Sequence, residues 1–375
     1  MAGLSRRSDM FTFRFGSAFV FLLLLVSACG SPSTTKSTAA EVLFAVTEGG
    51  SGTTAPGTVA IVGLDGRVRA TADFQARLGP VIPDAYTPLQ SVAQVVGSSV
   101  YYIDGAGNIR ALKVGSEPQL VAQFPLQGAQ EDTWFVVSPD GSRVLAGIVT
   151  FPAVGPPASG SSWPTLVGPT KFDLKTATAA GQPKTLVHLE APSGASGPAA
   201  IFPVAWTSSG PVAMLPEALT SQNAWWGGPL YMFDDAGKKT TQLGGADCES
   251  ASVQSNGLIP CTSGNYGVTV RDLSGKVIWT THVDGFDARD LHISPDGRAI
   301  SDNSHVETLA GGMVAMPTGF RVEGWLNNNT VVGRVTPDAN TIGGPDEGNL
   351  LWISLDKPAV IHDLGFKGDF VATVS

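Results

Sequence analysis

The sequence predicts an all-β protein in which a small antiparallel sheet is repeated several times. Glycine and proline are abundant, with 45 and 26 residues among 375, and such a composition is rich in turns. From residue 42 onward, short β-branched and aromatic runs alternate with Gly, Asp and Asn turns, and no long stretch has the periodicity of a helix. The chain is also longer than one ordinary hydrophobic core requires, unless that core is repeated.

The N-terminus has three zones. Met1–Arg14 contains three arginines and one acid, Phe15–Val26 is almost entirely apolar, and the small residues Ser27 and Ala28 follow. A basic start, a short apolar run and a small-residue cleavage site are typical of a secretory signal peptide. The apolar run is too short for a membrane-spanning helix, which needs roughly 20 residues. We therefore predict that residues 1–28 are removed on export.

A cysteine, Cys29, directly follows this segment. Residues 26–30 (VSACG) resemble the bacterial lipobox, and the resemblance implies that the Cys29 thiol is acylated and that this residue becomes the mature N-terminus. Gly30–Ala40 has the composition of a flexible spacer. The predicted organisation is a cleaved signal peptide, a lipidated cysteine with a linker at 29–41, and a folded domain at 42–375. The alternative is an ordinary signal peptide with an incidental cysteine.

The net charge of the chain limits the classes of partner that it can bind. The net charge is −9, and it becomes −11 without residues 1–28, because that segment carries three arginines and one aspartate. An acidic chain is a poor match for nucleic acid, and it has no polybasic segment to hold anionic lipid. The lipid on Cys29 is thus the predicted attachment to the cell membrane, on the extracytoplasmic side.

Two further cysteines, Cys248 and Cys261, flank a turn at Gln254–Gly257 almost symmetrically. This placement puts them on facing strands of one hairpin. In an exported protein such a pair predicts a disulfide. The alternative is two buried free thiols.

The repeat is clearest at Thr133–Ile148 and Asp290–Ser301, where an apolar strand, a Ser-Pro-Asp-Gly turn and a second apolar strand follow one another. Proline presets such a turn and glycine accepts a positive φ, so the chain reverses. These segments resemble the repeats of TolB-type β-propellers, relatives of the WD-repeat fold. A second hairpin follows each first one, for example Gly267–His282. Two hairpins make a four-stranded sheet of roughly 40–50 residues, the size of a propeller blade.

Counting these sheets predicts a single seven-bladed propeller, with six or eight blades as alternatives. The first sheet, Val42–Phe74, has only three strands, and Gly368–Ser375 supplies a spare one. We expect this C-terminal strand to complete the first blade and close the ring, which removes exposed sheet edges. The other six hairpin pairs begin near Leu89, Thr133, Ile201, Cys248, Leu291 and Phe320.

The two faces of such a propeller differ. Turns between the first and second and the third and fourth strands of each blade share one face, here called the tight-turn face. Connections between the second and third strands and between blades share the other, here called the long-loop face. The long segments all belong to the long-loop face: Thr47–Gly57, Gln75–Pro88, Phe151–Thr170, Pro216–Gly228 and Thr336–Gly348.

Aromatic residues in these segments predict a binding surface. Trp163, Trp225 and Trp226 lie in long segments of neighbouring blades 3 and 4, and Tyr86 and Phe286 lie in blade connections. Exposed aromatic side chains on loops of a rigid scaffold are common in recognition surfaces. The alternative is that these rings fold back and cover small cores of their own loops.

Three aspartates, Asp284, Asp287 and Asp290, lie in one connection on the same face. Their oxygens suit Ca²⁺, but their spacing does not match a known calcium loop. Solvated turn acids are the better interpretation, so no metal and no cofactor are predicted.

Signatures of enzyme chemistry are weak. The sequence has no Gly-x-Ser-x-Gly motif, and the five histidines lack the spacing of a zinc site. His292 falls on an innermost strand, where packing is the more common role for a lone histidine. We therefore predict a monomeric, non-enzymatic lipoprotein that binds an envelope protein or a glycan. The alternative is a hydrolase or lyase acting on an envelope polysaccharide, which acids converging on the ring centre would favour.

Overall fold

The computed structural model describes residues 42–48, 56–75, 92–128, 130–157, 164–179, 181–191, 200–215, 227–254, 256–262, 267–283, 290–335 and 348–375. The chain divides into two compact units, Met1–Ala40 and Glu41–Ser375, and the described residues belong to the second. Every regular element among them is a β-strand. No helix in this part of the chain is long and apolar enough to cross a bilayer.

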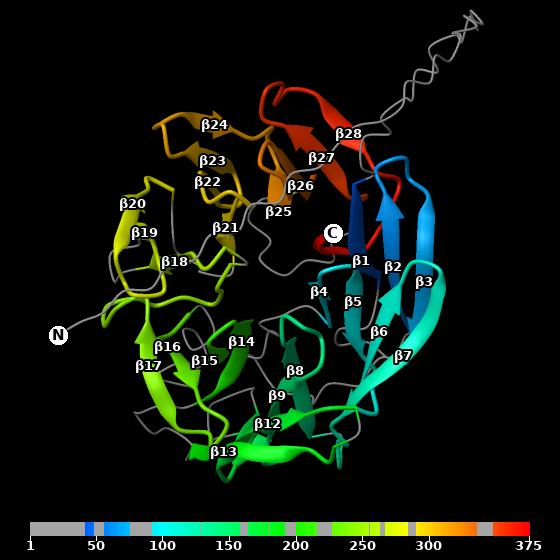
Figure 1. Cartoon of the computed structure of the whole chain (residues 1–375), viewed down its shortest axis with the longest axis vertical. Coiled ribbons are helices and arrows are strands. Elements are labelled where there is room, and N and C mark those ends of the chain that lie inside the picture. The colour runs from blue at the N-terminus through cyan, green and yellow to red at the C-terminus, as the bar shows by residue number, and fades with distance from the viewer. Residues whose placement is uncertain are drawn as a thin grey trace, which may run out of the picture. The chain divides into compact units, whose positions relative to one another are not determined.

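The strands form seven blades arranged around a common centre, which confirms the predicted seven-bladed propeller (Figure 1). Six blades have four strands, and blade 5 has three strands with a single bridge in the place of its innermost strand. Blade 1 contains β1 (Leu43–Glu48), β2 (Gly57–Gly63), β3 (Val68–Phe74) and β29 (Asp369–Val374). Blade 2 contains β4 (Ala93–Val96), β5 (Ser99–Ile103), β6 (Asn108–Lys113) and β7 (Ser116–Gln123). Blade 3 contains β8 (Glu131–Val137), β9 (Val144–Thr150), β12 (Thr170–Ala177) and β13 (Lys184–Ala191).

The remaining blades follow in chain order. Blade 4 contains β14 (Phe202–Thr207), β15 (Gly210–Met214), β16 (Leu230–Phe233) and β17 (Lys239–Leu243). Blade 5 contains β18 (Ile259–Thr262), β19 (Val268–Arg271) and β20 (Val277–Thr280). Blade 6 contains β21 (His292–Ile293), β22 (Ala299–Ser301), β23 (His305–Thr308) and β24 (Met313–Ala315). Blade 7 contains β25 (Phe320–Asn327), β26 (Thr330–Val335), β27 (Leu351–Ser354) and β28 (Ile361–Asp363).

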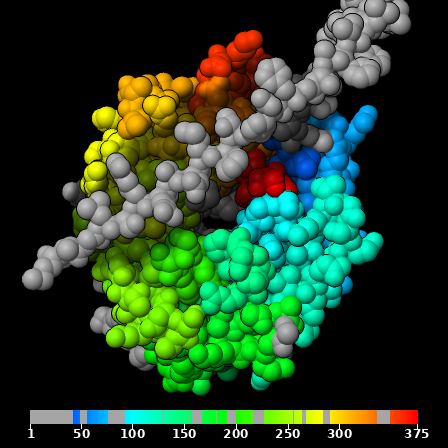
Figure 2. Space-filling model, in the orientation of Figure 1, coloured from blue at the N-terminus to red at the C-terminus, as the bar shows by residue number. Residues whose placement is uncertain are grey.

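The C-terminal strand closes the ring. β29 pairs antiparallel with β1, with Val374 opposite Leu43, and it takes the innermost position of blade 1. It also contacts β25 of blade 7 and β4 of blade 2. Figure 2 shows the red C-terminal atoms beside the blue strands of blade 1. The first and last parts of the folded chain therefore share one sheet, as the spare strand predicts.

The Ser-Pro-Asp-Gly turns form as expected. The N–H of Gly141 donates to the carbonyl of Ser138 at 2.8 Å, and the Asp140 carboxylate accepts from Ser138 and Ser142. These hydrogen bonds, that of the Ser138 hydroxyl first, lower the pKa of Asp140 to about 2. Gly141 has a φ of 73°, and a Cβ there would overlap the Tyr101 hydroxyl of blade 2. Glycine is thus required both by the turn and by the packing of neighbouring blades.

Blade 5 is irregular at its inner edge. Its innermost strand is reduced to one bridge between Glu249 and Thr262. Beside this bridge, Cys248 and Cys261 form a disulfide with a Cα–Cα distance of 4.9 Å, and both cysteines are buried. The predicted pairing is therefore present, and it links the two strands where the hydrogen-bonded ladder is shortest.

One long segment is more ordered than the sequence suggests. Within Phe151–Thr170, β10 (Ala153–Pro157) and β11 (Pro164–Val167) pair as a two-stranded sheet outside the blade. The two strands themselves contain three prolines, and small residues surround them, so the sequence predicts only a loop here.

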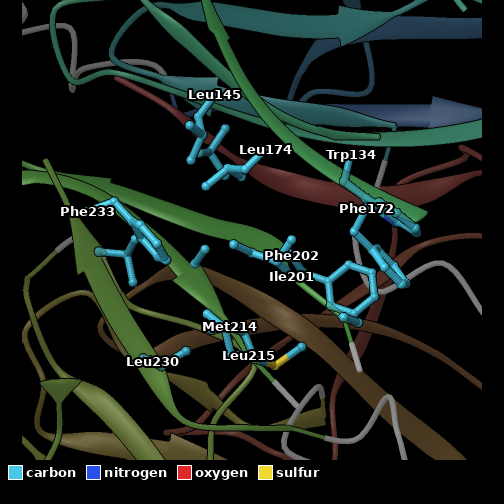
Figure 3. Packing of buried hydrophobic residues seen from close by; sticks show 14 of the residues in the cluster. Trp134, Leu145, Phe172, Leu174, Ile201, Phe202, Met214, Leu215, Leu230 and Phe233 are labelled. Carbon is cyan, nitrogen blue, oxygen red and sulfur yellow. The ribbon is translucent and has the colours of Figure 1, made fainter. Parts of the chain in front are cut away.

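The hydrophobic core lies between the blades. At the interface of blades 3 and 4, the Phe202 ring contacts Trp134 and Phe172 edge-on, at centroid distances of 4.9 and 5.8 Å (Figure 3). Each blade thus buries its apolar face against the next. A chain of this length therefore has a core that is repeated between blades, as the sequence predicts.

Candidate functional site

The predicted aromatic surface and most of the predicted acids lie outside the described residues. This applies to Tyr86, Trp163, Trp225, Trp226, Phe286, Asp284, Asp287 and the predicted lipidation site Cys29. Of the predicted site residues on the long-loop face, Asp290 is described. The candidate site is therefore built from the polar side chains around Asp290, at the inner strands of blades 6, 7 and 1.

Asp290 bridges two blades. Its carboxylate accepts a hydrogen bond from Arg321 at 3.0 Å and one from Asn303 at 2.9 Å, and the Arg321 guanidinium also donates to Asn303 at 3.2 Å. Asp290 precedes β21, Asn303 lies in the connection between β22 and β23, and Arg321 lies on β25. The charge of Asp290 is thus balanced by the Arg321 guanidinium, and the carboxylate links blades 6 and 7.

No group of three or more His, Cys, Asp or Glu residues suited to a metal occurs among the described residues. Asp290 has nitrogen donors rather than further carboxylates as its nearest polar partners. A hard cation such as Ca²⁺ takes six to eight oxygen ligands, so the described surroundings of Asp290 do not fit one.

His292 begins the innermost strand β21, two residues after Asp290. Its carbonyl accepts a hydrogen bond from the Trp325 indole of blade 7 at 3.0 Å. Part of the residue stays accessible, but its neighbours remove water from the ring, and this burial lowers the pKa of His292 to about 4. The imidazole is therefore neutral at pH 7. Asp290, His292, Asn303 and Arg321 are called the inner polar cluster below.

This lowered pKa predicts a loss of stability in mild acid. An unfolded histidine binds a proton below about pH 6.5, whereas the native one does so only near pH 4. The unfolded state therefore takes up more protons as the pH falls, and the free energy of unfolding decreases. Allowing for the accessible part of the residue, we expect a decrease of about 2 kcal/mol between pH 7 and pH 4.5.

Urea unfolding at the two pH values measures this loss. His292→Gln should remove most of the pH dependence. His362→Gln, which deletes an exposed ring stacked on Trp352, should retain it. The same pH dependence in all three proteins would contradict the assignment to His292.

A second group of charges lies at the ring closure. Arg334 of β26 is 2 % exposed, and its Nε lies 2.6 Å from Glu323 Oε1 of β25. Its Nη2 lies 2.8 Å from Asp369 Oδ1 of β29 and also donates to the Gly368 carbonyl. The N–H of Phe370 donates to Glu323 at 3.2 Å. Glu323, Arg334 and Asp369, here called the closure triad, thus link blade 7 to the C-terminal strand of blade 1.

The triad and the cluster each have an arginine in the sheet of blade 7. Arg321 and Arg334 are directly opposite in the pairing of β25 and β26, a placement that is unfavourable for like charges. Asp290 neutralises the first arginine, while Glu323 and Asp369 neutralise the second. Burial raises the pKa of Glu323, and both of its oxygens are engaged by Arg334 or by the backbone. Asp290, Glu323 and Asp369 therefore stabilise contacts within and between blades.

Sequence reasoning missed the closure triad. Arg321, Glu323 and Arg334 stand in a run that otherwise reads as an apolar hairpin, Phe320–Val335. Charges inside a buried strand are costly unless they are paired, so their presence was an available signal. Asp369, which pairs with Arg334, is 35 residues beyond it, and only ring closure brings the two together.

Comparison with known proteins does not assign this chain to a family. No protein-family model matches it, and no curated protein sequence matches it. Three solved structures with some likeness are the C-terminal WD40 domain of Sif2, an oligogalacturonate lyase from Vibrio parahaemolyticus, and BamB from Moraxella catarrhalis.

The likeness is weak in each case. The Sif2 domain is 10% identical with a TM-score of 0.38, covering 79% of this chain and 89% of that one. The lyase is 9% identical with a TM-score of 0.37, covering 82% and 71%. BamB is 16% identical with a TM-score of 0.37, covering 74% and 76%. The propeller assignment therefore rests on the strand pairing described above.

Proposed function

We propose that this protein is an extracytoplasmic lipoprotein, tethered to the cell membrane by an acylated Cys29, whose propeller binds an envelope protein through its long-loop face. The signal-peptide pattern and the lipobox resemblance support the tether. The rigid ring supports the binding role, because its long segments all attach to one face and carry Trp163, Trp225 and Trp226.

The observation that favours binding over catalysis is that carboxylates at the inner strands are ion-paired. Acids converging on the ring centre would favour the polysaccharide hydrolase or lyase. Among the described acids at inner strands, Asp290, Glu323 and Asp369 are each paired with an arginine and serve contacts within or between blades. Glu131 of β8 in blade 3 instead accepts hydrogen bonds from the Gln127 N–H and the Thr150 hydroxyl. A general acid or base must reach the substrate and exchange a proton with it. The paired carboxylates favour a scaffold.

The test is cross-linking in cells. The full-length lipoprotein and a Trp225→Ala/Trp226→Ala variant are cross-linked and purified under identical conditions. We expect the wild-type chain to capture one defined envelope protein and the double variant to lose it, because aromatic anchors dominate interface energetics.

A matched control is Leu120→Ala, which removes an exposed apolar side chain from the outer strand β7. This variant should capture the partner as the wild type does. Equal thermal stability of the three proteins excludes unfolding as the cause. Capture that is unaffected by the tryptophan substitutions would refute the proposed surface, and no capture by any of them would redirect the search to glycans.

A further inference from the structure

The tight-turn face carries an arc of exposed aliphatic side chains. In five consecutive blades, at least one such residue lies at or beside the turn between the third and fourth strands, and in each blade one of them is between 45 and 49 % exposed. These residues, here called the aliphatic arc, are Val277 in blade 5, Leu309 in blade 6, Val360 in blade 7, Val68 in blade 1 and Val114 in blade 2.

Blades 3 and 4 differ. Their corresponding turns follow Ala177 and Phe233 and consist of small and polar residues. Among the described residues of these two turns, no large hydrophobic side chain is exposed. The arc therefore covers one side of the tight-turn face and leaves the other side polar.

The folded chain begins on this same face. Leu43, the first residue of β1, pairs with Gly63, where the tight turn of blade 1 starts, and with Val374 near the end of β29. β1 then runs toward the long-loop face, where it ends at Glu48. The chain therefore enters β1 at the tight-turn face, in the blade that also carries the arc residue Val68.

The charges of these turns are balanced, although the whole chain carries −9. Asp65, Asp272 and Asp356 are each followed within four residues by a lysine or arginine. The turn of blade 2 adds the cation Lys113. In blade 6, Arg298 lies next to the turn, because its carbonyl accepts a hydrogen bond from the N–H of Leu309. The excess of acid lies elsewhere on the molecule, so an anionic surface would not repel this face.

We propose that the aliphatic arc rests on the phospholipid bilayer, so that the propeller lies tilted on the membrane with blades 3 and 4 raised. This inference rests on the proposed tether, which attaches through Leu43 to the same face. Five separate tips at different blades do not form one groove for a protein segment. A fluid acyl boundary accepts them at any spacing, because apolar burial there is non-directional.

The orientation has a consequence for recognition. The long-loop face points away from the bilayer, and the segments of blades 3 and 4 that contain Trp163, Trp225 and Trp226 belong to the raised side. The arc and the tether thus present the proposed binding surface to partners beyond the membrane.

The experiment measures the depth of single positions in the full-length lipidated protein, held on vesicles of phosphatidylcholine and phosphatidylglycerol. A fluorophore is attached to a cysteine introduced by Val114→Cys or Leu309→Cys, and quenching by brominated acyl chains is recorded. Cys248 and Cys261 are in a disulfide, and in the proposed lipoprotein Cys29 is acylated, so the introduced thiol alone is labelled.

Two control positions are also exposed. Gln182→Cys lies in the tight turn of blade 3, and Val335→Cys lies at the end of β26 on the long-loop face. We expect quenching at 114 and 309 to exceed that at both controls severalfold. Substituting Val68, Val277 and Val360 together by glutamine should reduce it toward the control value.

Flotation of the same samples reports the tether separately. Protein that floats with the vesicles but is quenched equally at all four positions would overturn the membrane-facing arc and leave the tether intact. Protein that does not float, and is quenched nowhere, would refute both. If 114 and 309 are shielded from aqueous iodide without being quenched by bromine, a protein surface covers the arc, and the bilayer assignment is wrong.

Discussion

Replacing Arg334 by alanine is expected to lower the free energy of unfolding by about 3–5 kcal/mol, the usual cost of breaking a buried ion pair. Arg334 is 2 % exposed and is the cation shared by Glu323 and Asp369. Without it, Glu323 keeps a buried carboxyl whose pKa burial already raises, and Asp369 loses a contact that holds the closing strand. The effect therefore combines desolvation of a charge with weaker closure of the ring.

Chemical denaturation of Arg334→Ala and Arg321→Ala measures this. The two arginines are opposite one another in β25 and β26, but the Arg321 side chain is 41% exposed, and a surface ion pair contributes about 0–1 kcal/mol. Adding Glu323→Gln to Arg334→Ala should recover part of the loss, because no charge is then left buried. Equal losses at positions 321 and 334 would show that the triad has no special role in closure.

The fold could be predicted from sequence because its signals are local. A Ser-Pro-Asp-Gly turn specifies a hairpin within about ten residues, and both such turns form, with Gly141 and Gly297 at φ of 73° and 75°. The strand Asp369–Val374 was recognisable as a spare one because Val42–Phe74 supplies only three. Counting local units and requiring closure therefore favours seven blades over the alternatives of six and eight.

The candidate site could be predicted only in part, because its contacts are not local. Asp290 was identified as a notable acid, but its partner Arg321 is 31 residues away on another blade. The partners of Arg334 lie 11 residues before it and 35 after it. Such pairs depend on how neighbouring blades pack, and no spacing rule in the sequence encodes that.

The same limit applies to the long segments. The apparent loop Phe151–Thr170 contains a two-stranded sheet, β10 and β11, since backbone pairing there does not need the alternating pattern that marks a blade strand. In blade 5 the opposite occurs, because an expected inner strand is reduced to a single bridge. Edge and inner positions of a sheet are thus where composition predicts strand pairing least well.

That reduced strand makes the disulfide of blade 5 the second large contribution to stability. The 13-residue separation of Cys248 and Cys261 closes a loop for which the chain-entropy account gives about 3 kcal/mol. In the native state, the bond also joins two segments that share a single bridge, Glu249 with Thr262. We expect the Cys248→Ala/Cys261→Ala variant to lose about 3 kcal/mol of unfolding free energy. Alanine is chosen over serine because a serine at these buried positions would leave a hydroxyl without a hydrogen-bond partner.

Reductant should reproduce this loss in the wild-type chain and leave the double alanine variant unchanged. Alkylation followed by mass spectrometry counts the thiols in the same samples, and the pair should be protected until reductant is added. If the native protein alkylates at both positions, the bond does not form in the exported chain. If the bond is present but its removal has no effect on unfolding, the inner edge of blade 5 is held by its buried neighbours. The cluster that contains both cysteines, with Ile259 of blade 5 and Met214 and Leu230 of blade 4, would then be the packing to weaken next.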